Sequence, residues 1–101
     1  MNKYITEFIG TFFLVLIIGI TNNPIAIGIG LSVLVYMGAH VSGAHYNPVV
    51  SLAMFIQKEI NRLELLYYII SQLIASLAAT FIVQNFDINS FEVIANTSNR
   101  A

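Results

Sequence analysis

The sequence predicts an all-α membrane protein with three transmembrane helices and one re-entrant half-helix. Apolar residues make up 57% of its 101 residues and charged residues only 9%, against roughly 25% charged in an ordinary soluble domain. No Asp, Glu, Lys or Arg occurs from Phe8 to Gln57, or from Leu65 to Phe86. A chain this short leaves much of its surface in contact with solvent, so it could not hide two such runs in a soluble core. A polar stretch from His40 to Val50 interrupts the first run.

The first span runs from Ile5 to about Thr21, short for a membrane helix but within the usual range. The single Lys before this span, Lys3, and the lack of a cleavage pattern indicate a retained helix, not a signal peptide. Asn22 and Asn23 suit a helix end, and Pro24 suits the first turn of the next helix. The second span is therefore expected from Pro24 to about His40.

The third span is expected from about Leu63 to Phe86, which makes residues 1–86 one membrane unit. Residues 87–101 form a polar tail, expected to be flexible. The Asn96-Thr97-Ser98 pattern in this tail is too weak a signal to predict glycosylation.

Residues Asn47 to Gln57 have a helical pattern but are too short to cross the membrane. At a rise of ~1.5 Å per residue they span roughly 16 Å, about half of a ~30 Å hydrocarbon core. The loop Val41–Tyr46 would carry the chain to mid-membrane, where non-helical backbone is tolerated only beside protein or water. A helix lying flat at the membrane interface is the alternative.

The polar stretch has the chemistry of a permeation path. Asn47 is a favoured N-cap and Pro48 suits the first helical turn, so the partly positive helix N-terminus would face the membrane centre. Gly43 and Ala44 permit an extended turn whose carbonyls could face a pore. A row of such carbonyls lets water or a small polyol pass by exchanging one hydrogen bond for the next, while the positive helix end repels cations.

Small residues also recur at helical spacing. Gly28 and Ser32 lie four apart in the second span, and Ser71, Ala75 and Ala79 form a row in the third. Rows of this kind let helix backbones approach closely in lipid. Ordinary abundance of Gly and Ala in membrane helices explains any single pair equally well.

Other chemistries have little support. The net charge of −1 gives no reason to expect nucleic acid as a partner, and there is no cysteine for thiol chemistry. His40 and His45 lack the third ligand that a metal site needs, so we expect no metal or cofactor. Proton chemistry by Glu7 and His45 is a distant alternative, since no nucleophile accompanies them and we identify no catalytic residue. Glu7 itself either supports the loop or reaches the interface.

Three motifs carry a resemblance to a known family. "GAHVSGAHYNPVV" resembles the first Asn-Pro-Ala box of the aquaporin, or major intrinsic protein, family. "EFIGTFF" from Glu7 resembles its first-helix signature, and "YYIISQLIAS" around Gln72 resembles its third helix. The three occur in the family's order between Met1 and about Phe86. The resemblance implies one half of an aquaporin-like inverted repeat, in which each repeat has three helices and one half-helix.

The resemblance also implies roles for single residues. Asn47 would donate its side-chain amide to the solute, and Pro48 and Val49 would cap the meeting point of two half-helices. Glu7 would accept hydrogen bonds from the loop, and Ile27 would contribute to the narrow selectivity region. Backbone carbonyls would form the solute ladder at Gly43, Ala44, His45 and Tyr46. Apart from the resemblance, we expect Gln72 to hydrogen-bond a helix or the loop, not the solute.

Two departures from the family pattern affect the function that the resemblance implies. Val49 replaces the Ala of the box, and no second repeat is found in the sequence. We therefore expect a channel component for water or small neutral solutes that closes its pore in an oligomer, with a separate second half-repeat or an inverted copy. The alternative is a non-conducting remnant or an accessory subunit packed in membrane lipid. Lys3, Lys58 and Arg62 against Arg100 predict a cytoplasmic N-terminus.

Overall fold

A computed structural model describes residues 2–86 and shows four helices in that part of the chain. They are α1 (Lys3–Thr21), α2 (Pro24–Ser42), α3 (Pro48–Ile56) and α4 (Arg62–Asn85). No strand occurs among the described residues. α1, α2 and α4 are each long and apolar enough to cross a membrane, which confirms the predicted fold class. The expected tail at 87–101, with Asn96 and Arg100, lies outside the described residues.

The turn between α1 and α2 forms as the sequence predicts. Asn22 ends α1 in the left-handed conformation, with φ 44°. The side chain of Asn23 caps α2 by accepting hydrogen bonds from the N–H groups of Ile25 and Ala26, and Pro24 follows it in the first turn. α2 continues to Ser42, beyond the predicted end at His40, because the left-handed residue that stops the helix is Gly43.

A capping box begins α4 and links it to α1. The Asn61 side chain accepts from the Glu64 N–H, and the Glu64 side chain accepts from the Asn61 N–H. The other Glu64 oxygen accepts a hydrogen bond from Lys3, near the start of α1. The two helix starts are therefore joined at the same end of the molecule.

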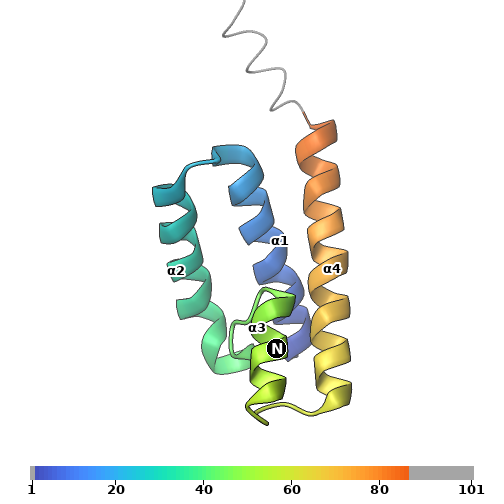
Figure 1. Ribbon diagram of the computed structural model, residues 1–101. Helices are drawn as coiled ribbons and strands as arrows, with labels where there is room; N and C mark the ends of the chain where they lie inside the picture. The colour runs from blue at the N-terminus through green and yellow to red at the C-terminus, as the bar shows by residue number, and fades with distance from the viewer. Residues whose placement is uncertain (1, 87–101) are drawn as a thin grey trace, which may run out of the picture.

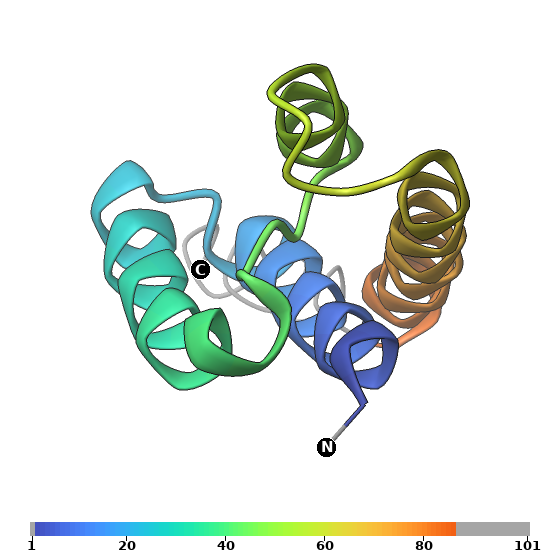
Figure 2. The same ribbon diagram turned by 90° about the horizontal axis from the view of Figure 1, so that it is seen from below.

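The helices are arranged as a bundle with one short member. α1 lies between α2 and α4 (Figure 2), and α3 packs against α4. α3 begins near mid-height and returns to the end where α2 stops and α4 starts (Figure 1). Its 9 residues span about 14 Å at the α-helical rise. This is the predicted re-entrant half-helix, so the alternative of a helix lying flat at the interface is wrong.

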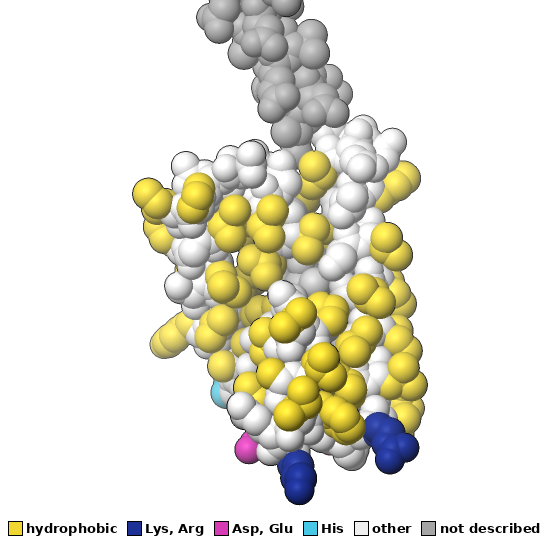
Figure 3. Space-filling model, viewed as in Figure 1, with side chains coloured by type: hydrophobic (Ala, Val, Ile, Leu, Met, Phe, Trp, Pro, Cys, Tyr) yellow, Lys and Arg dark blue, Asp and Glu magenta, His cyan; other side chains and the backbone are white. Residues whose placement is uncertain are grey.

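Apolar side chains cover most of the visible surface of the bundle, and the visible charges gather at the end where α3 stops (Figure 3). Among the exposed large side chains are Ile25 at 73% and Leu77 at 72%. Exposure of this kind fits contact with lipid acyl chains or other membrane helices, not with water.

The two predicted rows of small residues have different environments. Ala75 and Ala79 on α4 are fully buried, and Ser71 is partly buried. Gly28 and Ser32 on α2 are exposed, and a Cβ added at Gly28 would meet nothing within 4 Å. Among the described residues, no helix packs closely against Gly28 and Ser32, although their spacing predicted such a contact.

This difference can be measured. Replacing Ala79 with Leu would overpack a fully buried site and should lower the free energy of unfolding by about 1–3 kcal/mol. Gly28→Ala, the control, should raise stability by about 0.5–1 kcal/mol, because the site is open and Ala is the better helix former. Detergent-denaturant unfolding followed by circular dichroism gives both values. Equal stabilities for the two variants would contradict the packing of α4.

Candidate functional site

The loop between α2 and α3 has an unusual backbone. Gly43, Ala44 and Tyr46 have φ values of 84°, 51° and 56°, so the turn is left-handed where the sequence predicted an extended one. This conformation suits Gly43 but costs roughly 1–2 kcal/mol at a residue with a side chain. Ala44 and Tyr46 therefore need contacts that hold them in place.

Ser42 Oγ accepts from the Ala44 N–H, and Glu7 of α1 holds Tyr46 and the rest of the loop. The Glu7 side chain is fully buried, so it does not reach the interface. One carboxylate oxygen accepts from the Ser42 hydroxyl at 2.7 Å and the His45 N–H at 3.0 Å. The other accepts from the Tyr46 N–H at 2.7 Å and the Gln72 side-chain amide at 3.0 Å. One carboxylate thus joins α1, the end of α2, the loop and α4.

The network continues into α3. The Gln72 amide also donates to the Ser51 hydroxyl at 2.9 Å, and Ser51 Oγ lies 2.8 Å from His45 Nδ1. The Ser51 hydroxyl has both a donor and acceptor positions, so it bonds Gln72 and His45 at the same time. The half-helix is therefore fixed to both α4 and the loop.

Tyr68 on α4 completes the support. Its ring stacks on His45 with centroids 4.2 Å apart, and its hydroxyl donates to the Ser42 carbonyl at 2.6 Å. The sequence reasoning gave no role to Ser42, Ser51 or Tyr68. The available signal was the spacing of Tyr68 and Gln72, which places them on one face of α4.

The carbonyls of the loop are left available. The N–H groups of Ala44, His45 and Tyr46 donate inward, to Ser42 and Glu7. Among residues 2–86, the carbonyl oxygens of residues 43–46 accept no hydrogen bond. The loop therefore presents four consecutive acceptors without a partner in the described structure.

The tip of α3 lies next to these acceptors. Asn47 Oδ1 accepts from the Val49 N–H at 2.7 Å, the N-cap that the sequence predicts, and Pro48 occupies the first turn. Asn47 is exposed, and its amide nitrogen makes no hydrogen bond to any described residue. Val49 is 72% exposed. An amide donor and an uncovered apolar side chain thus mark the start of the half-helix.

Two other sequence candidates lie elsewhere. Ile27 is half-buried in the first turn of α2, at the opposite end of that helix from Ser42. His40 is exposed whereas His45 is buried. No group of three or more His, Cys, Asp or Glu in residues 2–86 could hold a metal ion.

Comparison with known proteins identifies relatives by sequence. The family model described as "Major intrinsic protein" matches residues 1–100. The chain is 35% identical to the glycerol uptake facilitator protein-like 6 of Lactiplantibacillus plantarum over 85% of this chain and 44% of that protein. It is 33% identical to nodulin-26 of Glycine max, covering 79% of this chain and 35% of that protein.

A third relative is aquaporin Z of Photorhabdus laumondii, 29% identical over 82% of this chain and 42% of that protein. The chain thus spans less than half the length of each of these curated relatives. No solved structure gives a significant match.

The Glu7 network predicts the effect of a single-atom change. In Glu7→Gln, either orientation of the new amide sets an NH₂ group against a backbone N–H that now bonds to oxygen, that of His45 or that of Tyr46. We expect the variant to lose about 1.5–3 kcal/mol or more of unfolding free energy, the value of a hydrogen bond to a charged group. Chemical unfolding in micelles measures the loss.

Thr11→Val is the matched control. Thr11 is also buried on α1, and its hydroxyl has no hydrogen-bond partner in residues 2–86. Removing it should be neutral or slightly stabilising. If Glu7→Gln is no less stable than Thr11→Val, the carboxylate does not hold the loop.

Proposed function

Because the chain belongs to the major intrinsic protein family, we propose that it is one half of a membrane channel for water or small neutral solutes. It is an integral membrane protein with three helices able to span the bilayer. The observation that carries the proposal is the row of unpaired carbonyls at residues 43–46 beside the N-terminus of α3. The names of the relatives, a glycerol uptake facilitator-like protein and an aquaporin, support the same class of solute.

The proposed path works by hydrogen-bond exchange. The carbonyls of Gly43, Ala44, His45 and Tyr46 would replace the solute's bonds to water one at a time, and the Asn47 amide would donate at the end of the row. The loop has acceptors but no charged side chain, so a neutral solute would pass without being trapped. The partly positive N-terminus of α3 disfavours cations.

The pore needs a second wall. α3 covers only about half of a membrane thickness, and Val49 and Pro48 at its tip are not enclosed by the described residues. We propose that a second half-repeat meets this tip, with Ile27 contributing to the narrow region at the other end of α2. A bulky Val49, 72% exposed, would shape that contact.

A separate second chain fits this role better than an inverted copy. Lys3, Lys58 and Arg62 lie at the end of the bundle where α1 and α4 start and α3 stops. The positive-inside tendency places this end in the cytoplasm. An inverted copy would have to insert against the same bias. The rival function is an accessory subunit that does not conduct, which the open tip of α3 equally permits.

Conduction tests the proposal directly. Proteoliposomes would contain the chain co-expressed with the part of the Lactiplantibacillus plantarum relative that this chain does not match. We expect osmotic water or glycerol permeability above that of empty liposomes, without increased proton conductance. Glu7→Gln should lower this permeability and Thr11→Val should not. Empty-liposome rates, with both chains folded and inserted together, would favour the accessory subunit.

Orientation is tested by cysteine labelling, since the chain has no native cysteine. Asn23→Cys, in the turn between α1 and α2, should react with an impermeant thiol reagent added to intact cells. Gln57→Cys, at the end of α3, should react only after permeabilisation. Equal labelling of both positions in intact cells would show dual insertion and restore the inverted copy as the partner.

A further inference from the structure

The side chain of Tyr46 connects the loop to α2. Its hydroxyl donates to the Leu34 carbonyl at 2.7 Å, and the side chain is only 4% exposed. The ring lies between Gly10 of α1 and Gly38 of α2. A Cβ added at Gly10 would overlap the ring, and one added at Gly38 would overlap the hydroxyl. Both glycines thus leave the space that a tyrosine at this position requires.

Tyr46 is also the bulky residue of the loop with a left-handed backbone, at φ 56°. A large side chain seldom adopts this conformation unless the surroundings impose it. Here two hydrogen bonds do so from opposite sides. The Tyr46 N–H donates to Glu7 on α1, and the Tyr46 O–H donates to Leu34 on α2.

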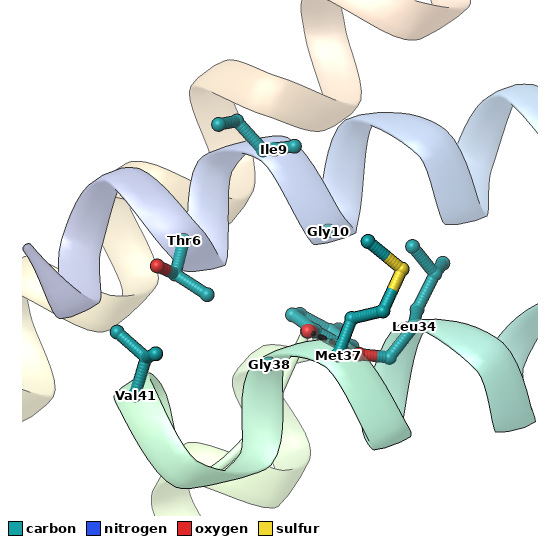
Figure 4. Close-up of a pocket in the computed structure, with 8 residues that line it drawn as sticks. Thr6, Ile9, Gly10, Leu34, Met37, Gly38 and Val41 are labelled. Atoms are coloured by element: carbon teal, nitrogen blue, oxygen red, sulfur yellow. Dashed lines mark hydrogen bonds between the residues drawn. The ribbon is translucent and has the colours of Figure 1, made fainter. Parts of the chain in front are cut away.

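The ring is packed between Gly10 and Gly38 but not enclosed on every side. A cavity of about 140 Å³ lies beside it, between α1 and α2 (Figure 4). Its lining is mostly apolar and includes Ile9, Leu34, Met37 and Val41. Because there is free space on this side of the ring, the hydroxyl bond to Leu34 contributes to its position beyond the packing against Gly10 and Gly38.

We propose that Tyr46 is a positioning residue, whose side chain acts as a strut between α1 and α2 and sets where the carbonyls of His45 and Tyr46 point. This inference rests on the proposed channel function and extends it. Those carbonyls belong to the solute path, so a change in the strut changes permeation without touching the solute. The Leu34 carbonyl keeps its ordinary partner within α2 when the hydroxyl is removed. Tyr46→Phe should therefore fold.

The first measurement is amide hydrogen exchange by NMR, on the full chain in micelles. In Tyr46→Phe, the N–H groups of His45 and Tyr46 should exchange about three- to tenfold faster, as expected for the loss of one neutral hydrogen bond. Amides in the middle of α4 should exchange as in the wild type. Tyr36→Phe is the matched control, because Tyr36 is 88% exposed on α2 and its hydroxyl bonds to no described residue. Unchanged exchange at His45 and Tyr46 in Tyr46→Phe would overturn the proposal.

A pair of glycine variants distinguishes the effect of the Tyr46 hydroxyl bond from the effect of simple ring packing. Gly38→Ala should displace the hydroxyl and speed loop exchange, whereas Gly28→Ala, in open space, should not. Gly38→Ala/Tyr46→Phe removes the overlapping hydroxyl, so it should recover global stability but keep the fast loop exchange of Tyr46→Phe. Wild-type loop exchange in this double variant would mean that ring packing suffices, and the strut would be rejected.

Permeability then links the strut to function. In the co-expressed assembly, Tyr46→Phe should change the ratio of glycerol to water permeability at least about twofold, the smallest effect expected from one lost hydrogen bond. Tyr36→Phe should leave the ratio unchanged. If the wild-type assembly does not conduct but Tyr46→Phe loosens the loop, the channel proposal fails and the strut itself stands. An unchanged ratio with a loosened loop would overturn the role of Tyr46 in positioning the path.

Discussion

The structure depends on one buried carboxylate. Glu7 accepts four hydrogen bonds, two at each oxygen, from α2, the loop and α4. A carboxylate suits this position because both of its oxygens are acceptors, whereas an amide would bring one donor against donors. Within a membrane, water does not readily replace such bonds. The N–H groups of His45 and Tyr46 therefore depend on Glu7, and the inward direction of the loop amides leaves the loop carbonyls unpaired.

The same contacts explain how a strained loop persists. Left-handed backbone at Ala44 and Tyr46 costs roughly 1–2 kcal/mol at each residue. Hydrogen bonds to a charged group contribute about 1.5–3 kcal/mol each, and Glu7 receives two from this loop. The bonds therefore offset the strain. Since Ser51 and Gln72 fix α3 to the same network, the loop and the half-helix are held as one unit.

The parts that the sequence predicted correctly depend on local signals. Long runs without charge gave the three spans, and Asn47-Pro48 gave the start of α3. The missed parts depend on tertiary contacts. Ser42, Ser51 and Tyr68 are unremarkable residues for a membrane helix, and only the folded chain brings them to Glu7, Gln72 and His45. The left-handed loop was missed because Ala44 and Tyr46 do not favour it intrinsically. The exposed row of Gly28 and Ser32 shows that small residues at helical spacing do not by themselves predict which helix will pack against them.

One half of the proposed channel must present a rigid wall and still leave a surface for the other half. The polar contacts of the described loop are turned toward the bundle interior, onto Glu7 of α1, Ser42 and Leu34 of α2, and Ser51 of α3. The uncovered surfaces include Asn47 and Val49 at the tip of α3 and the exposed face of α2 that includes Gly28. A rigid loop loses little conformational entropy when a partner binds, because its geometry is already set. In the proposed two-part channel, the buried carboxylate would therefore serve assembly as well as permeation, since it fixes the shape of the tip before any second half binds.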